Sequence, residues 1–169
     1  ELNSRLDSLV TGAFLLNRIL DRMMSLFSVK FKLLNTSKIL HKTLAHHFPL
    51  AGDEVSEFQD SRGMLTIYGD TPMADFDVAT HIELFERMLE EFIKYQDAIE
   101  DVIDYATSEK DLMTKNFLMK YLSEMNPYIT TAMNLVEISK AYGVEPMAMQ
   151  LFDNEMEHCL TVPNLASGD

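Results

Sequence analysis

The chain is poor in residues that several common protein classes depend on. It has one cysteine, Cys159, so an internal disulfide and a cysteine-rich zinc site are both excluded. No apolar run approaches the ~20 residues of a membrane helix. The first residues also lack the charged-then-apolar layout of a secretory signal. We therefore expect a cytoplasmic protein that does not span a membrane.

Basic residues are scarce as well. The 27 Asp and Glu residues outnumber the 14 Lys and Arg residues, which gives a formal net charge of −13. This charge opposes nonspecific binding to phosphate backbones or anionic lipid, so cations are the expected partners. The chain also has no glycine-rich nucleotide loop and no nucleophile elbow, and nucleotide enzymes and hydrolases are not expected.

Apolar residues recur every three or four positions through most of the chain, which predicts amphipathic helices and an all-α fold. With 169 residues, 47% of them hydrophobic and only 6 of them Gly, the chain suits one domain over residues 1–169. The predicted helices cover about 5–27, 35–64, 80–107 and 109–142, and a short amphipathic helix near 147–152 lies in a C-terminal appendage, 143–169.

Several residues mark where these helices begin or bend. The polar residues at 35–37 are candidate N-caps for the second helix. Thr80 and Glu83 form a capping box for the third helix. Pro49 should kink the second helix or shift its start, and Pro127 should bend the fourth.

The lengths of the connections favour one topology. The third and fourth helices are joined by a few residues, which makes them antiparallel neighbours. About fifteen residues join the second helix to the third, and at ~3.3 Å per residue they reach ~50 Å, more than a ~28-residue helix. This favours a ferritin-like four-helix bundle with one long crossover. A plain up-down-up-down bundle is also compatible with the sequence.

The second helix carries the residues best suited to metal chemistry. Steps of seven, four and three residues place His46, Asp53, Glu57 and Asp60 in a ~60° stripe roughly opposite the apolar face. Imidazole and carboxylate ligands together suit Fe²⁺, Zn²⁺ or Mn²⁺. Ligands on an outward face can be completed only by water or by another subunit, so we predict a site shared across a dimer interface. The candidate ligands are His46, Asp53, Glu57 and Asp60, with His41, His47 and Glu54 as further members.

The same residues have a plainer interpretation, a hydrated acidic surface whose histidines relieve charge repulsion. A di-iron centre inside one bundle is not expected, because the acids of the third and fourth helices lie beside or opposite the apolar stripes. No catalytic residue is predicted beyond the metal ligands.

Three stretches together resemble a known family. They are the Leu-Asn motif within 15–20, the acidic stretch ending in Asp-Ser-Arg at 60–62 and followed by Gly69 and Pro72, and the hairpin over 95–118. They are similar to the DNA-protecting ferritin-like family, Dps. The resemblance implies a hollow dodecamer that oxidises iron at dimer-interface sites with peroxide or oxygen and stores the mineral.

The chain also departs from that family. The first helix has no histidine, with Phe31 and its neighbours in that region, and no Lys-rich N-terminal extension precedes it, so DNA binding is not expected. A ferritin-like scaffold or interaction protein without a working metal centre is the alternative function.

Overall fold

Helices make up the regular structure of the computed structural model, which describes residues 1–159 and has no strand among them. The all-α prediction is confirmed. Residues 160–169 of the predicted appendage lie outside the described residues. Over residues 1–159, no helix combines the length and the apolar character that crossing a membrane requires. The elements are α1 (Leu2–Ser25), η1 (Leu26–Lys30), α2 (Leu34–Leu40), η2 (His41–Ala45), α3 (His47–Ser61), α4 (His81–Ser108), α5 (Leu112–Tyr142) and α6 (Pro146–Cys159), where η marks a π-helical turn.

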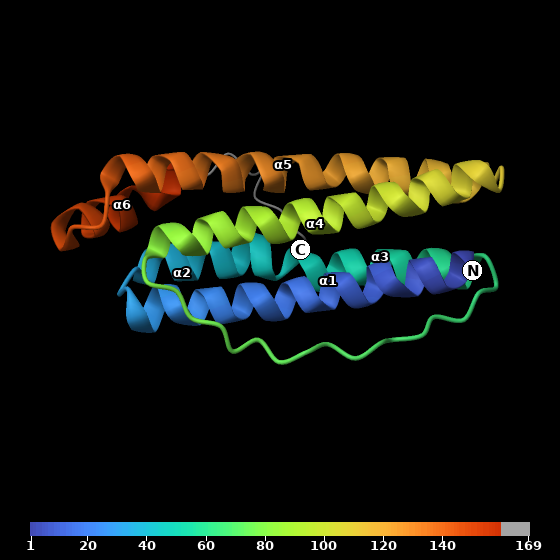
Figure 1. Cartoon of the computed structure of the whole chain (residues 1–169), viewed down its shortest axis with the longest axis horizontal. Helices are drawn as coiled ribbons and strands as arrows, with labels where there is room; N and C mark the ends of the chain where they lie inside the picture. The colour runs from blue at the N-terminus through green and yellow to red at the C-terminus, as the bar shows by residue number, and fades with distance from the viewer. Residues whose placement is uncertain (160–169) are drawn as a thin grey trace.

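The long helices lie side by side as an elongated bundle (Figure 1). In chain order α1 runs along the bundle, and α2, η2 and α3 return beside it as one interrupted rod. The segment 62–80 then crosses back over the length of the bundle, so α4 starts at the same end as α2. Consequently α3 and α4 run in the same direction, and α5 runs antiparallel to α4.

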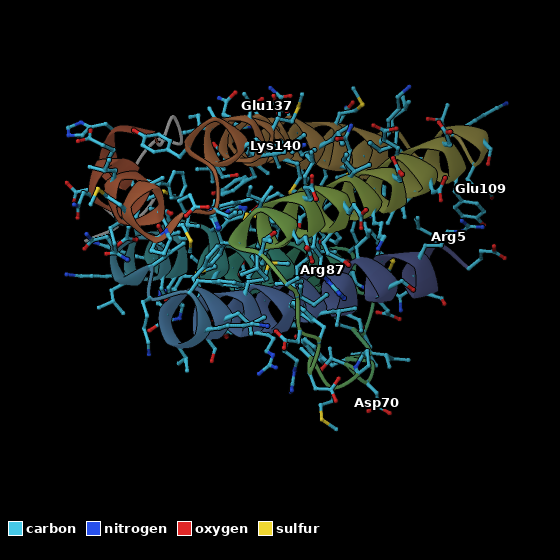
Figure 2. All side chains as sticks on the ribbon, turned by 60° about the vertical axis from the view of Figure 1, so that its left-hand side comes forward. Arg5, Asp70, Arg87, Glu109, Glu137 and Lys140 are labelled. Carbon is cyan, nitrogen blue, oxygen red and sulfur yellow. The ribbon has the colours of Figure 1, made fainter. Side chains whose placement is uncertain are left out.

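The crossover segment 62–80 is attached along the surface of α1. Its contacts follow α1 in register, so this segment and α1 run in parallel. At its far end Arg87 of α4, labelled in Figure 2, lies over the ring of Phe76 at 3.8 Å. The hydrogen bonds, at 2.9–3.0 Å, join Asn3 to Leu65, Asp7 to Ile67, Thr11 to Gly69 and Arg22 to Phe76.

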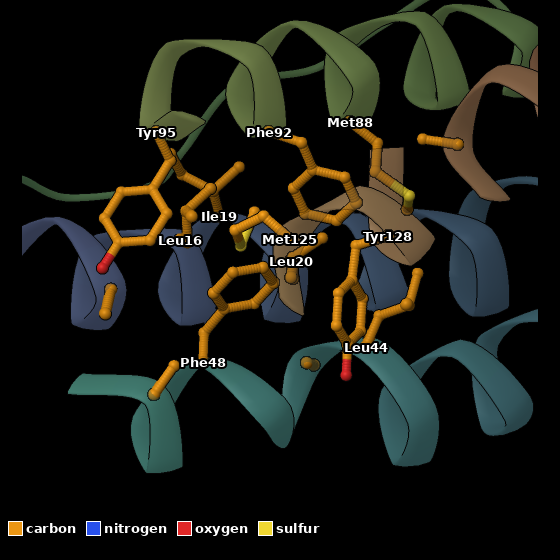
Figure 3. Packing of buried hydrophobic residues seen from close by; sticks show 14 of the residues in the cluster. Leu16, Ile19, Leu20, Leu44, Phe48, Met88, Phe92, Tyr95, Met125 and Tyr128 are labelled. Carbon is orange, nitrogen blue, oxygen red and sulfur yellow. The ribbon is translucent and has the colours of Figure 1, made fainter. Parts of the chain in front are cut away.

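The middle of the bundle is filled by aromatic and aliphatic side chains. Phe48 of α3 packs against Phe92 of α4 and Tyr128 of α5, with ring centroids 5.4 and 5.9 Å apart (Figure 3). Leu16 and Met125 fill the space around these rings and are buried as well. Burial of this apolar surface is the main favourable contribution to folding.

The start of α4 follows the predicted capping box. The Glu83 amide donates to Thr80 Oγ1 at 3.3 Å, which confirms the hydroxyl half of the motif. The Glu83 carboxylate accepts from the amide of Ala79, one residue earlier than the motif requires. Pro127 lies inside α5, which continues as one helix from Leu112 to Tyr142.

The predicted caps for the second helix are wrong. That helix starts at Leu34, and Leu33 at the N-cap position provides no side-chain bond. The free amides of Asn35 and Thr36 donate instead to the carboxylate of Asp153, on α6, at 3.1 and 2.8 Å. Asp153 is buried, and it also accepts from the Thr36 hydroxyl at 2.7 Å. The C-terminal helix therefore supplies the cap that the local sequence lacks.

Pro49 does not kink the second helix at its own position. It lies in the first turn of α3, where its missing N–H would not have been bonded within that helix. The helix is interrupted just before it, where η2 winds as a π-helical turn with the His46 amide donating to the His41 carbonyl at 3.2 Å. The Ala45 carbonyl, which the N–H of residue 49 would ordinarily reach, accepts from Asn17 Nδ2 of α1 at 3.0 Å.

We predict that Asn17→Ala destabilises the fold by about 1–3 kcal/mol, because it leaves the Ala45 carbonyl without a donor. In a Pro49→Ala background, the restored N–H can serve that carbonyl, so Asn17→Ala should cost less there. Urea unfolding of the four proteins of this cycle measures the difference. An equal cost in both backgrounds would show that Pro49 and Asn17 are not coupled.

We also predict that Asp153→Asn destabilises the fold by about 1.5–3 kcal/mol, since the amide cannot replace a carboxylate that accepts three hydrogen bonds. The exposed neighbour Glu155 serves as the control, and Glu155→Gln should leave the unfolding free energy within about 0.5 kcal/mol of wild type. Thermal unfolding compares them. Equal effects of the two substitutions would contradict the capping role of Asp153.

Candidate metal-binding face

The predicted ligands all lie on the rod formed by η2 and α3. His41 opens η2, His46 lies at the junction, and His47 begins α3. Six of the seven side chains are exposed, and only His47 is half-buried. The remaining members, all on α3, are Asp53, Glu54, Glu57 and Asp60.

Two of the histidines form a pair on the outer surface. The rings of His41 and His46 meet edge to face with centroids 4.5 Å apart. Because η2 is wound as a π-turn, residues five apart in sequence lie on one side of it. Asp21 of α1 joins them, with Oδ1 at 3.3 Å from His41 Nε2. The group offers two imidazoles and one carboxylate to the solvent.

The acids of α3 lie further along the same rod. Asp53 is seven residues beyond His46, which corresponds to about 10 Å at the α-helical rise. Asp53, Glu57 and Asp60 point outward and form no ion pair with any described residue. The predicted stripe therefore consists of an imidazole group and a separate carboxylate group.

His47 faces the neighbouring helix α5. Its ring stacks on Tyr128 at 4.2 Å between centroids, with planes 20° apart. Burial lowers the pKa of the His47 imidazole to about 4, so this side chain is neutral at pH 7. Burial and the nearby charge of Glu124 raise the pKa of Tyr128, whose buried hydroxyl has no partner among the described residues.

Glu54 lies on that same side of α3. Its pKa is raised, first by burial and then by the negative charge of Glu124 on α5, while Lys120 acts in the opposite direction. Lys120 also pairs with Glu124 at 3.7 Å. His47 and Glu54 thus belong to the contact between α3 and α5 and not to the outer face with His46.

In residues 1–159, no three His, Cys, Asp or Glu side chains converge into a group that could hold a metal ion. The structure brings His41 and His46 together, and it separates both from the acids of α3. Asp21 was not among the predicted residues. Nothing in the local sequence marks it, because its approach to His41 depends on how α1 and η2 align.

A tyrosine pair is the main polar feature inside the bundle. The hydroxyls of Tyr95 and Tyr121 lie 2.8 Å apart, and they reach the carbonyl oxygens of Leu9 and Ala51 at 2.9 and 3.1 Å. The two hydroxyl groups thus have two protons for three oxygen–oxygen contacts. Burial raises the pKa of both tyrosines, so the pair stays neutral and ties the four helices that contribute to it.

His81 is a second enclosed polar group. It is fully buried, and neither ring nitrogen has a partner among the described residues. Phe31, Phe85 and Phe152 surround the ring with centroids 5.9–6.4 Å away. Burial lowers the pKa of His81, so the site holds a neutral imidazole.

Comparison with known proteins finds no family model and no curated protein that matches the chain. The resemblance to Dps therefore rests on the sequence stretches described above.

We predict that acid weakens the fold through His47. Its pKa is lowered from about 6.5 to about 4 in the folded chain, so this contribution is complete above pH 6.5 and is lost as pH falls toward 4. The expected loss between pH 7 and pH 5 is about 2 kcal/mol. His47→Phe keeps a ring on Tyr128 and should remove this part of the pH dependence of the unfolding free energy. Urea unfolding at both pH values measures it.

Wild type and His47→Phe differ only at residue 47. The difference between their losses of unfolding free energy from pH 7 to pH 5 is therefore the contribution of His47. His81→Phe should reduce the slope in the same direction, because the pKa of His81 is lowered too. Identical pH profiles for wild type and His47→Phe would contradict the prediction.

Proposed function

We propose that this chain is a ferritin-like four-helix bundle that binds and oxidises ferrous iron and stores the product in a homo-oligomer, as its resemblance to Dps implies. The path of the chain supports the architecture. Segment 62–80 crosses the length of the bundle and places α3 and α4 in parallel, which is the arrangement with one long crossover.

The observation that carries the proposal is the contact between the imidazoles of His41 and His46 with Asp21 beside His41, a partial donor set that does not form a three-ligand site within residues 1–159 of one copy. Two imidazoles in contact at 4.5 Å and a carboxylate at 3.3 Å from one of them are donors that suit Fe²⁺, and also Zn²⁺ or Mn²⁺. The group opens toward solvent, so further ligands have to come from water or from a second copy of the chain.

The acids of α3 supply the other half of the proposed chemistry. Carboxylates are hard donors that hold ferric products, and Asp53, Glu57 and Asp60 are free to do so. A second copy that places these acids opposite the imidazole group would complete the ligand set. Iron is the substrate in this proposal, and the protein contributes ligands and electrostatic attraction. His47 and Glu54, which belong to the contact between α3 and α5, are not part of the proposed site.

An oligomeric scaffold is the alternative function. It is favoured by the absence of any converging set of three metal-binding side chains within residues 1–159 of one copy. Metal analysis with light scattering separates the two cases. An iron-laden particle of many subunits supports storage, whereas a metal-free small oligomer supports the scaffold.

We predict that His46→Ala weakens Co²⁺ binding, used as a stable probe for Fe²⁺, by at least about tenfold, because changes next to a metal ligand already cost 10- to 100-fold. Isothermal titration measures the affinity. His158→Ala is the matched control, since His158 is an exposed histidine on α6. Equal Co²⁺ affinities of the two variants would show that the imidazole pair does not bind the metal.

Oxidation is tested separately. Ferrous iron is added to the apoprotein under air and the ferric product is followed by ultraviolet absorbance. Glu57→Ala should slow the reaction, and Glu155→Ala, which removes an exposed acid of α6, should not. A wild-type rate equal to the uncatalysed background would eliminate the catalytic part of the proposal.

A further inference from the structure

The outer face of the α2–η2–α3 rod presents one continuous exposed line of side chains. Apart from the adjacent pair His41 and Lys42, its positions follow steps of three or four residues, and the π-turn of η2 keeps the two halves in line. One large apolar residue, Leu50, lies in the middle with 64% of its surface exposed. The exposed residues, in order, are Lys38, His41, Lys42, His46, Leu50, Asp53, Glu57 and Asp60.

Charge is divided along this line. Every exposed charge before Leu50 is basic, and every exposed charge after it is acidic. The basic half belongs to a larger basic region, because six of the 14 Lys and Arg residues lie between positions 18 and 42, against one of the 27 acids. Among the described residues, Arg18, Lys38 and Lys42 have no ion-pair partner.

We propose that two copies of this chain pair antiparallel through this face, with a twofold axis passing near Leu50. A twofold contact is self-complementary, so each basic half meets the acidic half of the other copy. The dimer deepens the proposed function, since it supplies the second copy that the metal site requires, but it forms without metal.

The spacing along the rod fits this pairing. Lys42 lies about 12 Å before Leu50 and Glu57 about 10 Å after it, at the α-helical rise. His46 and Asp53 lie about 6 and 5 Å from Leu50 in the two directions. A twofold axis at Leu50 therefore sets Lys42 opposite Glu57 and His46 opposite Asp53 of the partner.

A second copy fits this face better than a nucleic acid does. A phosphate attracted to Lys42 would also meet Asp53, which lies about 16 Å further along the rod, about two Debye lengths at physiological salt. A protein partner must instead carry both signs in reverse order with an apolar centre. The chain itself meets that description.

The size of the face sets the expected strength. A rod over residues 34–61 is about 42 Å long and about 10 Å wide, which gives about 400 Å² per copy, half of a standard interface. We therefore expect a weak dimer that salt dissociates. Raising NaCl from 0.05 to 0.5 M should increase the apparent dissociation constant of the dimer at least about tenfold.

Charge reversal followed by sedimentation velocity tests the pairing on the whole chain in the presence of EDTA. The double variants Lys38→Glu/Lys42→Glu and Glu57→Lys/Asp60→Lys should each be monomeric. Mixed in equal amounts, the two should form a heterodimer. In a chain with all four substitutions, the basic half of the line becomes acidic and the acidic half becomes basic, so this chain should dimerise again. Damage to the fold cannot produce that outcome.

Crosslinking tests the position of the axis. In a Cys159→Ser background, Leu50→Cys should form a disulfide-linked dimer under mild oxidation, because the two copies of residue 50 face each other. Leu151→Cys, at an exposed leucine of α6, is the control and should crosslink more slowly.

Three outcomes would overturn the proposal: wild type that stays monomeric at low salt, equal crosslinking at residues 50 and 151, or a monomer that binds a 20-base-pair DNA duplex through Lys38 and Lys42. Failure of the metal proposal is distinct. A dimer in EDTA that binds no Co²⁺ refutes the metal site alone, and Co²⁺ binding by a monomer refutes the dimer alone.

Discussion

Pro49 has no N–H, and the carbonyl oxygen of Ala45 therefore depends on Asn17 of α1. This hydrogen bond lies at the point where the second long rod changes its winding. The π-turn of η2 takes up one more residue per turn than an α-helix, so it rotates everything beyond it by about 100° relative to α2. At an unbroken 100° per residue, Asp53, Glu57 and Asp60 would lie about 40–100° to one side of Lys38, and the π-turn brings Glu57 into line with Lys38.

The interior of the bundle confines chemistry to the outside. Phe48, Phe92 and Tyr128 occupy its middle (Figure 3), and an unpaired carboxylate there would be too costly to remain charged. The hydroxyls of Tyr95 and Tyr121 are committed to each other and to backbone carbonyls. Apart from the neutral His81 imidazole and the Tyr128 hydroxyl, which are buried without a partner, the titratable groups left free among the described residues lie at the surface, and exposed ligands become a site only when something else covers them.

Features set by neighbouring residues could be predicted, and features set by distant residues could not. The period of apolar residues located α1, α4 and α5, and Thr80 caps α4 as its local motif requires. The cap of α2 escaped prediction because Asp153 is more than a hundred positions away. At the site, the stripe on α3 was predicted to face outward and does, whereas Asp21 depends on the alignment of two separate helices.

The proposed metal site and the proposed dimer act on each other through electrostatics. In a single copy, the imidazoles of His41 and His46 lie in a region where basic residues outnumber acids, which disfavours a cation. Pairing would bring the partner's acids opposite that region and reverse the sign of the local potential. By linkage, whatever the dimer adds to metal affinity, the metal adds to dimer stability. Ferrous iron would then be bound in proportion to how much protein is paired.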